Sequence, residues 1–265
     1  MTDKICKILD NIRNRKPLVH AITNPISINQ CANTILAVGA KPIMAEHPKE
    51  VYEITASSDA LMLNLGNITD ARMESMIISL NIANKREIPV LLDAVGVACS
   101  ELRREYTHRL LKESSLSVIK GNYSEIASLY DREYYSPGVD ADSSLDVRYI
   151  TNLAKELSQK YKTVIIATGK TDVVTDGKRV VYIKNGSPSL SSVTGTGCML
   201  GSLCATFMTS ASSIDAAISA CCYFGICGEL AKSDKGIGSF MINLIDKLST
   251  LNENEISEYI NVEEE

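Results

Sequence analysis

Residues 191–200, SSVTGTGCML, combine groups suited to binding an anion with a group suited to reacting. Two glycines flank a threonine, a cysteine follows at once, and an apolar stretch with a helical pattern comes next. Glycines at the entrance of a helix allow backbone N–H groups to converge on an anion, and the helix dipole adds to the attraction. The turn from Gly195 to Cys198, with Gly197 inside it, is therefore a candidate phosphate cradle. The alternative is a plain tight turn before a helix.

The thiol of Cys198 stands at this expected helix N-terminus, a position that lowers the pKa of a cysteine. The spacing of the histidines gives the thiol no partner in the sequence, so neither a Cys/His nor a Ser/His/Asp arrangement is indicated. His20 falls inside an expected strand, and we interpret it as a hydrogen-bonded core histidine. No Gly-Lys-Ser/Thr follows spaced glycines, so the turn is not a P-loop.

Two carboxylates next to expected strands are candidates for holding one Mg²⁺ ion. Asp93 ends the strand in PVLLDAVG, and Glu125 lies in GNYSE at the start of a helix. Magnesium keeps several waters and takes few carboxylates, so such a pair is sufficient, directly or through water. Each residue also has a purely structural interpretation. Glu125 complements a helix dipole, and Asp93 is a loop residue bonded to its own backbone.

Short apolar strands alternate with helical patterns along the chain. Strands are expected over residues 18–23, 41–45, 60–66, 89–93, 116–120 and 162–168, with a hairpin turning at Asp176-Gly177. Helical patterns cover residues 27–39, 69–87 and the chain from Gly197 onward, and a further helix is expected to open at Pro48. This alternation predicts an α/β fold with a mostly parallel sheet covered by helices on both faces.

Polar residues and glycines gather at the expected carboxyl ends of the strands, where open parallel sheets bind ligands. They are Thr23, Asn24, Asn64, Asp93, Lys120, Gly121, Asn122, Thr168 and Gly169, and Met44 stands at such an end as well. Thr168 and Gly169 are suited to contacting a nucleotide phosphate through a hydroxyl and the backbone. An ordinary β-turn is the alternative.

The composition limits the class of protein. Among 265 residues, 27 basic and 32 acidic groups give a net charge of −5, and tryptophan is absent, which argues against a nucleic-acid partner. No apolar run approaches the about 20 residues that span a bilayer, and the N-terminus lacks the apolar core of a secretory signal. The eight cysteines form no C-x-x-C pair and are typical of reduced thiols in a cytoplasmic protein. We expect one domain over residues 1–265, with residues 131–144 as a surface loop.

Taken together, these segments closely resemble the hydroxyethylthiazole kinases of the thiamine pathway, which belong to the ribokinase-like superfamily. The matching stretches are LVHAITN, ANTILAVGAKPIMA, DALMLNLG, PVLLDAVGV, VIKGNYSEIASL, ATGKTDVVTDG and VTGTGCMLGSL. The first two discriminate this family from the pyrimidine kinases, which tend to open with a glycine-rich stretch. The resemblance implies transfer of the γ-phosphate of ATP to the primary hydroxyl of 4-methyl-5-(2-hydroxyethyl)thiazole, for thiamine biosynthesis or salvage.

The resemblance also implies roles for individual residues. It places Asn24, Met44 and Gly195 at the thiazole, and Lys120, Thr168 and Gly197 at ATP. Asp93 and Glu125 match residues near magnesium. Cys198 stands where many ribokinase-like enzymes carry an aspartate as base. Many relatives have arginine in place of Lys120, which keeps the charge but lacks the planar fork of a guanidinium. A homotrimer with active sites at subunit interfaces is implied as well.

Two other functions remain open at this point. One is a kinase of a related alcohol, of the hydroxymethylpyrimidine or pyridoxal type. The other is a nucleotide-binding relative that is not a kinase, such as a lyase acting on hydrated nicotinamide cofactors or a silent regulator. The candidate magnesium and phosphate residues argue against a silent regulator, and the thiazole-kinase type of N-terminal segment argues against the lyase.

Overall fold

The computed structural model describes residues 1–131, 133–136 and 145–265. Most of the loop expected over residues 131–144 therefore lies outside the described residues. Within them, one sheet carries strands in the order β2-β1-β3-β4-β5-β6-β7-β8-β9. The strands are β1 (Leu18–Ile22), β2 (Lys41–Ile43), β3 (Ala60–Asn64), β4 (Val90–Asp93), β5 (Val118–Asn122), β6 (Val164–Thr168), β7 (Asp172–Thr175), β8 (Val180–Ile183) and β9 (Val262–Glu264).

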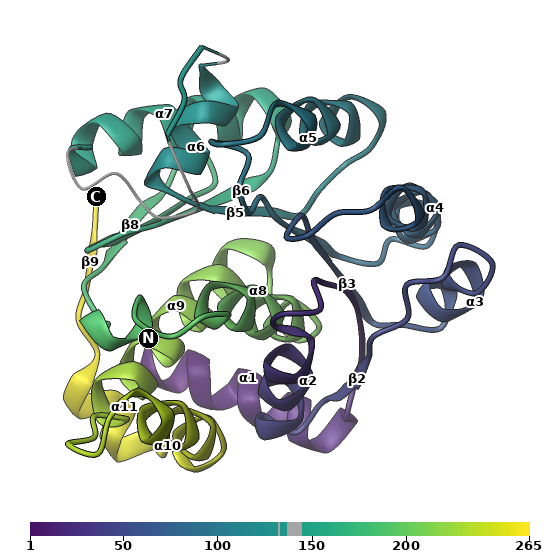
Figure 1. Cartoon of the computed structure of the whole chain (residues 1–265). Helices are drawn as coiled ribbons and strands as arrows, with labels where there is room; N and C mark the ends of the chain where they lie inside the picture. Colours follow the sequence, from purple (N-terminus) through teal and green to yellow (C-terminus); the bar gives the residue numbers. More distant parts are fainter. Residues whose placement is uncertain (132, 137–144) are drawn as a thin grey trace.

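The sheet is parallel from β2 to β6 and antiparallel from β6 to β9. Helices cover both faces (Figure 1), which confirms the predicted α/β class. The helices are α1 (Thr2–Arg15), α2 (Ile28–Ala37), α3 (Val51–Ala56), α4 (Asp70–Lys85), α5 (Glu101–Glu113), α6 (Tyr123–Tyr130), α7 (Val147–Tyr161), α8 (Thr196–Met208), α9 (Ser213–Leu230), α10 (Ile237–Thr250) and α11 (Glu253–Tyr259), with a 3₁₀ turn at Pro188–Leu190.

The central strands are buried on both faces because their side chains alternate between two apolar clusters. In β3, Ala60 and Met62 pack with α1, α2, α8 and α9, whereas Leu61 and Leu63 pack with α4, α5, α6 and α7. A strand with two covered faces needs apolar residues throughout, which explains the unbroken ALML sequence. The same alternation fixes the register of each strand and therefore the position of its last residue.

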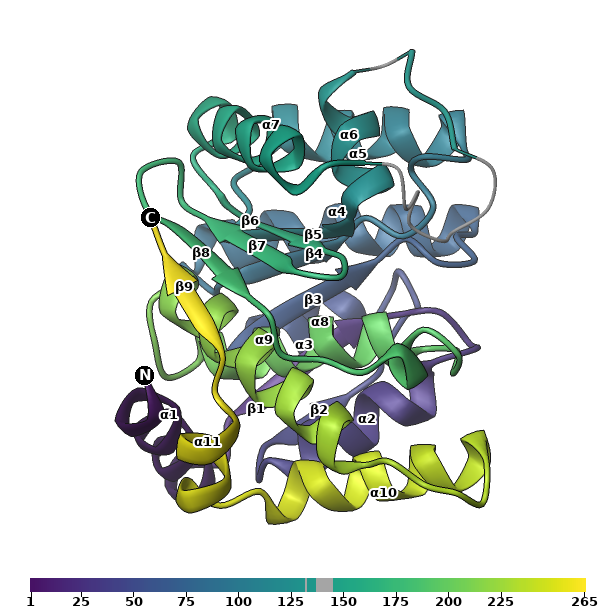
Figure 2. The same ribbon diagram turned by 90° about the vertical axis from the view of Figure 1, so that its left-hand side faces the viewer.

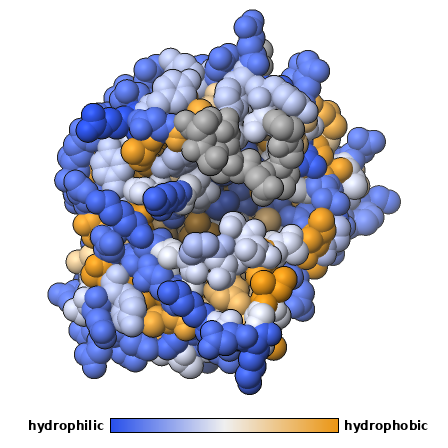
Figure 3. Space-filling model, turned by 60° about the vertical axis from the view of Figure 1, so that its left-hand side comes forward, coloured by the Kyte–Doolittle hydropathy of each residue, from blue (hydrophilic) through white to orange (hydrophobic). Residues whose placement is uncertain are grey.

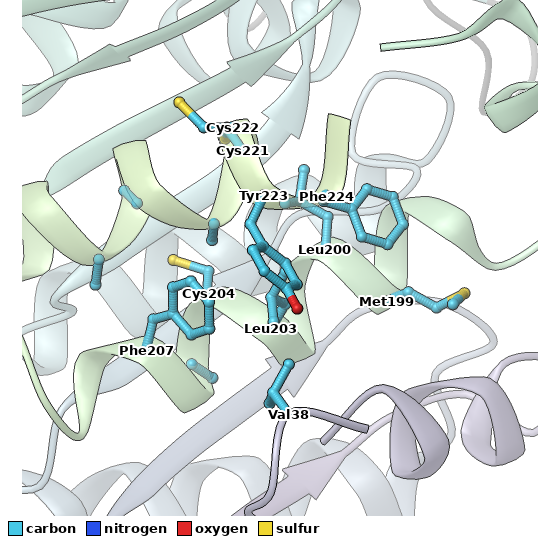
Figure 4. Close-up of a cluster of buried hydrophobic side chains, with 14 of the residues drawn as sticks. Val38, Met199, Leu200, Leu203, Cys204, Phe207, Cys221, Cys222, Tyr223 and Phe224 are labelled. Carbon is cyan, nitrogen blue, oxygen red and sulfur yellow. The ribbon is translucent and has the colours of Figure 1, made fainter. Parts of the chain in front are cut away.

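Helices α8 and α9 form the centre of one cluster (Figure 4). The rings of Phe207 and Tyr223 meet edge to face, with centroids 5.9 Å apart, and the Tyr223 hydroxyl donates to Leu248 O. In the described part of the chain, α9 alone is long and apolar enough to cross a membrane by length and composition. Since 72 % of this helix is buried inside the protein, it is a core helix.

Three local expectations need correction. The helix expected at Pro48 begins at Val51, because residues 48–50 form a turn in which Glu50 N and Val51 N both donate to His47 O. Strand β5 continues past Lys120 to Asn122, because its last two residues still pair with β6. The C-terminal residues, expected to be helical, end in β9.

Strand β9 closes the antiparallel edge of the sheet at the C-terminus (Figure 2). Its glutamates form ion pairs with the basic residues that flank β8: Glu264 with Arg179, and Glu263 with Lys184. No local hydrophobic pattern announces such a strand, since its pairing partner lies about 80 residues earlier.

The surface in Figure 3 is mostly hydrophilic, with separate apolar patches and a hollow near the middle of this face. Large apolar side chains are exposed on two neighbouring helices in particular. Leu36 on α2 is 54 % exposed, and Ile237 and Ile242 on α10 are 61 % and 63 % exposed. Because α2 and α10 are in contact, these side chains belong to one region of the molecule.

Candidate active site

The candidate site lies at the carboxyl ends of the parallel strands, where the N-terminus of α8 meets the sheet. Strands β3 and β4 end at the same level, since Asn64 pairs in register with Asp93. Asp93 in turn pairs with Lys120 of β5. Helix α8 contacts both β3 and β4. Residues that are far apart in the sequence thus converge at one end of the sheet, as expected for an open α/β fold.

The glycine turn does precede a helix. Gly195 is the N-cap of α8 and has φ = 90°, a left-handed conformation that glycine adopts without strain. A Cβ atom on Gly195 would lie 3.1 Å from the Cβ of Ser27, so the turn packs closely on the start of α2. Cys198 is the third residue of α8 and is 8 % exposed. The geometry of a helix entrance predicted from the sequence is therefore present.

The Cys198 sulfur accepts hydrogen bonds from two asparagine side chains. Asn64 Nδ2 lies 3.2 Å and Asn24 Nδ2 lies 3.5 Å from Sγ. Asn64 Nδ2 also donates to Asp93 Oδ2 at 2.9 Å, and Asn64 Oδ1 accepts from Asn24 Nδ2 at 3.0 Å. One continuous buried network thus joins Asn24, Asn64, Asp93 and Cys198.

A buried ion pair extends the network to Lys120 and the glycine turn. Lys120 Nζ lies 3.0 Å from Asp93 Oδ1, and the two side chains are 4 % and 0 % exposed. Burial alone would lower the pKa of Lys120, but the carboxylates of Asp93 and Glu125 outweigh burial and raise it. The same Nζ lies 3.5 Å from the position that a Cβ on Gly197 would occupy. The turn therefore places its backbone directly beside a fixed positive charge.

Glu125 is held by the backbone. Its Oε1 accepts from Gly96 N and its Oε2 from Asn122 N, both at 2.7 Å, and the second bond is part of a capping box that starts α6. Burial raises the pKa of Glu125 to about 7, against the opposing effect of Lys120. The structural interpretation of Glu125 as a helix-start residue is therefore confirmed. Its part in a magnesium site stays a prediction.

The expected lowering of the Cys198 pKa is wrong. Burial and the nearby Asp93 carboxylate raise the pKa of the thiol, although Ser27, Lys120 and Asn64 act in the opposite direction. The helix terminus does not compensate for the loss of water around the sulfur. Cys198 is consequently a thiol at neutral pH.

Two other residues predicted for the site, Thr168 and Met44, also stand at the carboxyl ends of parallel strands. Thr168 ends β6 beside Asn122, and its hydroxyl lies 3.4 Å from Gly121 O. Met44 follows β2 and packs, half-buried, against the apolar cluster around α8. His20 is fully buried and bonded to Thr55 and Ala45, which confirms its interpretation as a core histidine.

Two polar residues at the candidate site, Asn64 and Asp172, were not assigned a role from the sequence. Asn64 stood among the strand-end residues, but an asparagine after a buried strand is also an ordinary loop residue, so nothing in its neighbourhood in the sequence singled it out. Asp172 begins β7, and its Oδ1 accepts from Gly169 N at 3.0 Å. It therefore shapes the turn that follows Thr168.

Comparison with known proteins identifies the family. Residues 9–254 match the hydroxyethylthiazole kinase family. The chain belongs to this family. It is 44 % identical over 261 residues to hydroxyethylthiazole kinase 2 of Clostridium botulinum (strain Kyoto / Type A2), covering 97 % of this chain and 98 % of that protein.

Solved structures agree. The hydroxyethylthiazole kinase of Pyrococcus horikoshii OT3 superposes with a TM-score of 0.91 and 34 % identity, covering 99 % of both chains. A ribokinase-like superfamily protein of Enterococcus faecalis V583 matches with a TM-score of 0.64 and 13 % identity, over 98 % of this chain and 95 % of that one, which is a likeness of fold alone. The predicted family, ribokinase-like fold and hydroxyethylthiazole kinase activity are confirmed.

The carboxyl of Asp172 makes the stability of the ligand-free protein depend on pH. Burial raises the pKa of Asp172 to about 7, whereas the pKa of an unfolded aspartate is about 3.9. Between these values the folded protein binds more protons than the unfolded chain, so this residue's contribution to the free energy of unfolding decreases as the pH rises. Asp172→Asn keeps an oxygen for Gly169 N and removes the titration. We expect the variant to gain stability relative to wild type between about pH 5 and about pH 8 in urea titrations.

Asp176→Asn is the matched control, because backbone N–H groups lower the pKa of Asp176 and it is ionised throughout this range. Its stability difference from wild type should stay constant between the two pH values. A constant difference for Asp172→Asn as well would contradict the prediction.

Proposed function

We propose that the network at the end of β3, β4 and β5 transfers the γ-phosphate of ATP to the primary hydroxyl of 4-methyl-5-(2-hydroxyethyl)thiazole. The observation that carries this proposal is the position of Lys120. Its ammonium lies beside Gly197, one residue before Cys198, and is bonded to Asp93. A fixed cation next to a helix-start glycine turn is suited to holding a transferring phosphoryl group.

On the acceptor side, we assign the thiazole to Asn24, Met44 and Gly195. Asn24 supports this assignment because its side chain reaches Cys198 and also bonds the backbone N–H groups of Ile26 and Ser27, at the start of the segment that leads into α2. Gly195 also packs on Ser27. The alcohol would thus be bound between the start of α2 and the start of α8.

Cys198 is the proposed base. In its thiolate form the sulfur takes the proton of the substrate hydroxyl, while the hydroxyl oxygen bonds to the γ-phosphorus and the bond from that phosphorus to the bridging oxygen of ADP breaks. The thiol then returns its proton to solvent. Because phosphoryl-transfer transition states are largely loose, a weak base is sufficient, and charge stabilisation by Lys120 and the backbone of residues 195–198 carries much of the rate.

On the nucleotide side, we assign ATP to Lys120, Thr168 and Gly197. Thr168 ends the strand next to β5, and the turn after it is shaped by the Gly169–Asp172 bond. Lys120 contributes a point charge and no bidentate fork, so the backbone N–H groups of the glycine turn supply the directional contacts to phosphate oxygens.

The donor set fits a magnesium ion held mainly through water. Asp93 retains lone pairs on both oxygens beside its bonds to Lys120 and Asn64, and both Glu125 oxygens are oriented by backbone N–H groups. The described residues contain no cluster of three or more such ligands, which suits an ion that takes few carboxylates and keeps several waters. When bound, Mg²⁺ would neutralise charge on the β- and γ-phosphates. Asp93 and Glu125 are the residues that would hold it.

Removing either carboxylate tests this assignment. We expect Asp93→Asn and Glu125→Gln to lower kcat by at least about tenfold and to raise the magnesium concentration needed for half-maximal rate, because positioning and charge neutralisation dominate the reaction. Steady-state rates over a magnesium titration provide the measurement. Glu156→Gln, a change in an exposed tyrosine-bonded glutamate of α7, serves as the control and should change neither quantity. Unchanged rates and magnesium dependence in both site variants would exclude the assignment.

Cys198 variants test the base. We expect Cys198→Ala to lower kcat by about 10²-fold or more, within the about 10²–10⁴-fold range of a lost general base, with the dissociation constants of ATP and thiazole nearly unchanged. Cys198→Asp should retain more activity than Cys198→Ala, because a carboxylate can accept the same proton. Cys204→Ala, in the buried core of the same helix, is the control for loss of a thiol. An inactive Cys198→Asp that still binds both ligands in calorimetry would show that the thiol only packs.

We also propose a cytoplasmic homotrimer of single-domain subunits, with an active site at each subunit interface. The exposed apolar side chains of α2 and α10 support an interface close to the thiazole side of the site, since α2 begins beside Asn24. The free state of all eight cysteines is consistent with a reducing compartment. A single sheet whose two faces carry the two apolar clusters supports one domain.

Light scattering tests the trimer. We expect about three times the monomer mass for wild type at assay concentration, and a lower mass for Ile242→Lys, because a charge would be buried in the proposed interface. Leu102→Lys changes an equally exposed residue of α5, on the other side of the sheet, and should leave the mass unchanged. A monomer mass for wild type would refute the trimer.

A further inference from the structure

Asn64 bonds directly to both Asp93 and Cys198 in the candidate site. It ends β3, is fully buried, and makes four hydrogen bonds. Its Oδ1 accepts from Gly66 N at 2.9 Å and from Asn24 Nδ2 at 3.0 Å. Its Nδ2 donates to Asp93 Oδ2 at 2.9 Å and to Cys198 Sγ at 3.2 Å.

These partners fix which way the amide points. The backbone N–H of Gly66 is only a donor, and the Asp93 carboxylate is only an acceptor when ionised, so a flipped amide would face a donor with a donor and an acceptor with an acceptor. The positive end of the amide dipole is therefore directed at the sulfur and the carboxylate together. Asn64 cannot take a proton from Cys198, but it favours negative charge on the sulfur.

The surroundings leave this arrangement little freedom. A Cβ on Gly66 would lie 2.7 Å from Asn24 Nδ2 and 2.9 Å from Asn64 Oδ1, so only glycine at position 66 allows the two asparagines to meet. On the other side, Asp93 is held by Lys120. Asn64 thus joins Asn24, assigned to the alcohol, and Cys198, the proposed base, to Asp93. Through Asp93 it is linked to Lys120, which is assigned to ATP.

We propose that Asn64 is a positioning residue that acts through Cys198: it holds the sulfur in place by its Nδ2–H bond and favours the thiolate, while it fixes the Asp93 carboxylate by the second bond of the same amide. This inference rests on the proposed function for its effect on turnover. Its effect on the thiol itself does not depend on which alcohol is phosphorylated.

The first experiment is a double-mutant cycle. Asn64→Leu has the same number of side-chain heavy atoms and removes all four hydrogen bonds. Asn84→Leu is the matched control, because Asn84 on α4 also bonds the backbone, to Leu80 O, Ser115 O and Ser115 N, far from the site. We expect Asn64→Leu to lower kcat by about 10–100-fold with KM for both substrates within about threefold, and Asn84→Leu to lower kcat less than about twofold.

The decisive comparison is between the loss of kcat that Asn64→Leu causes in wild type and the loss that it causes in the Cys198→Ala variant. If Asn64 acts through Cys198, the loss of kcat caused by Asn64→Leu should be at least about fivefold smaller when Cys198 is already alanine. Equal losses in the two backgrounds would overturn the proposal, because the asparagine would then act independently of the thiol.

The second experiment uses no substrate. Iodoacetamide alkylates the thiolate form of a cysteine, so its rate of reaction with Cys198 reports the thiolate fraction. The reaction is run at about pH 8, and its progress is measured by mass spectrometry of the Cys198 peptide. We expect a rate at least about threefold slower in Asn64→Leu than in wild type and an unchanged rate in Asn84→Leu. An unchanged rate in Asn64→Leu would also overturn the proposal.

The two experiments separate this inference from the proposed function. A wild-type protein that does not phosphorylate the thiazole alcohol would refute the function, and the alkylation rates would still decide the role of Asn64. Thermal unfolding checks that each variant is folded. Should Asn64→Leu not fold, Asn64→Ser replaces it in the same double-mutant cycle and the same alkylation assay. Serine has a hydroxyl on a shorter side chain, and we expect kcat and the alkylation rate to fall in this variant too.

Discussion

The buried ion pair between Asp93 and Lys120 is the constraint on which the rest of the site depends. Removing two charges from water costs several kcal/mol for each ion, and the cost is offset only where the pair is close and its remaining hydrogen-bonding capacity is used. Here the ions are 3.0 Å apart, and Asn64 bonds the second oxygen of Asp93. Each partner would be strongly unfavourable without the other, so the ends of β4 and β5 must stay in register.

Helix α8 lies close to this ion pair because it has a glycine, Gly201, where it faces the strands. A Cβ on Gly201 would lie 2.9 Å from the Met62 Cε and 3.5 Å from Asp93 Oδ2, so the helix rests almost directly on β3 and β4. A Cβ on Gly197 would lie 3.5 Å from Lys120 Nζ, an ordinary contact distance, so the close packing depends on Gly201 and not on Gly197. Gly201 thus lets the first turns of α8 lie close to the strands that carry the ion pair.

The charge balance of the ligand-free site explains the direction of its pKa shifts. Lys120 is surrounded by two carboxylates and a thiol, and all are removed from water. Burial raises the pKa of Glu125 and of Cys198, and Asp93 adds to both shifts. A triphosphate would bring further negative charge into this space. That excess is the physical reason for assigning a divalent cation beside Asp93 and Glu125.

The sequence by itself determined the α/β class, most strand positions, the helix entrance at residues 195–198 and, through resemblance, the family. These features depend on local apolar periodicity, on glycine and on motifs that are contiguous in the chain. The start of α3 at Val51 is also local, since the turn before it is bonded to His47, but the proline pattern did not indicate it. The tertiary structure alone decided the pairing of β9 with β8 and the thiol state of Cys198. Both depend on groups distant in sequence: a partner strand, or burial beside Asp93.

The role of Asn64 illustrates the same division. Its position at a strand end could be predicted from the run of apolar residues before it, but its four partners come from three other parts of the chain as well as from Gly66. Local sequence specifies where a polar side chain stands along a strand. Which groups it meets is decided by the register of the neighbouring strands and by how closely a helix packs on them, because hydrogen bonds form only over a few ångströms.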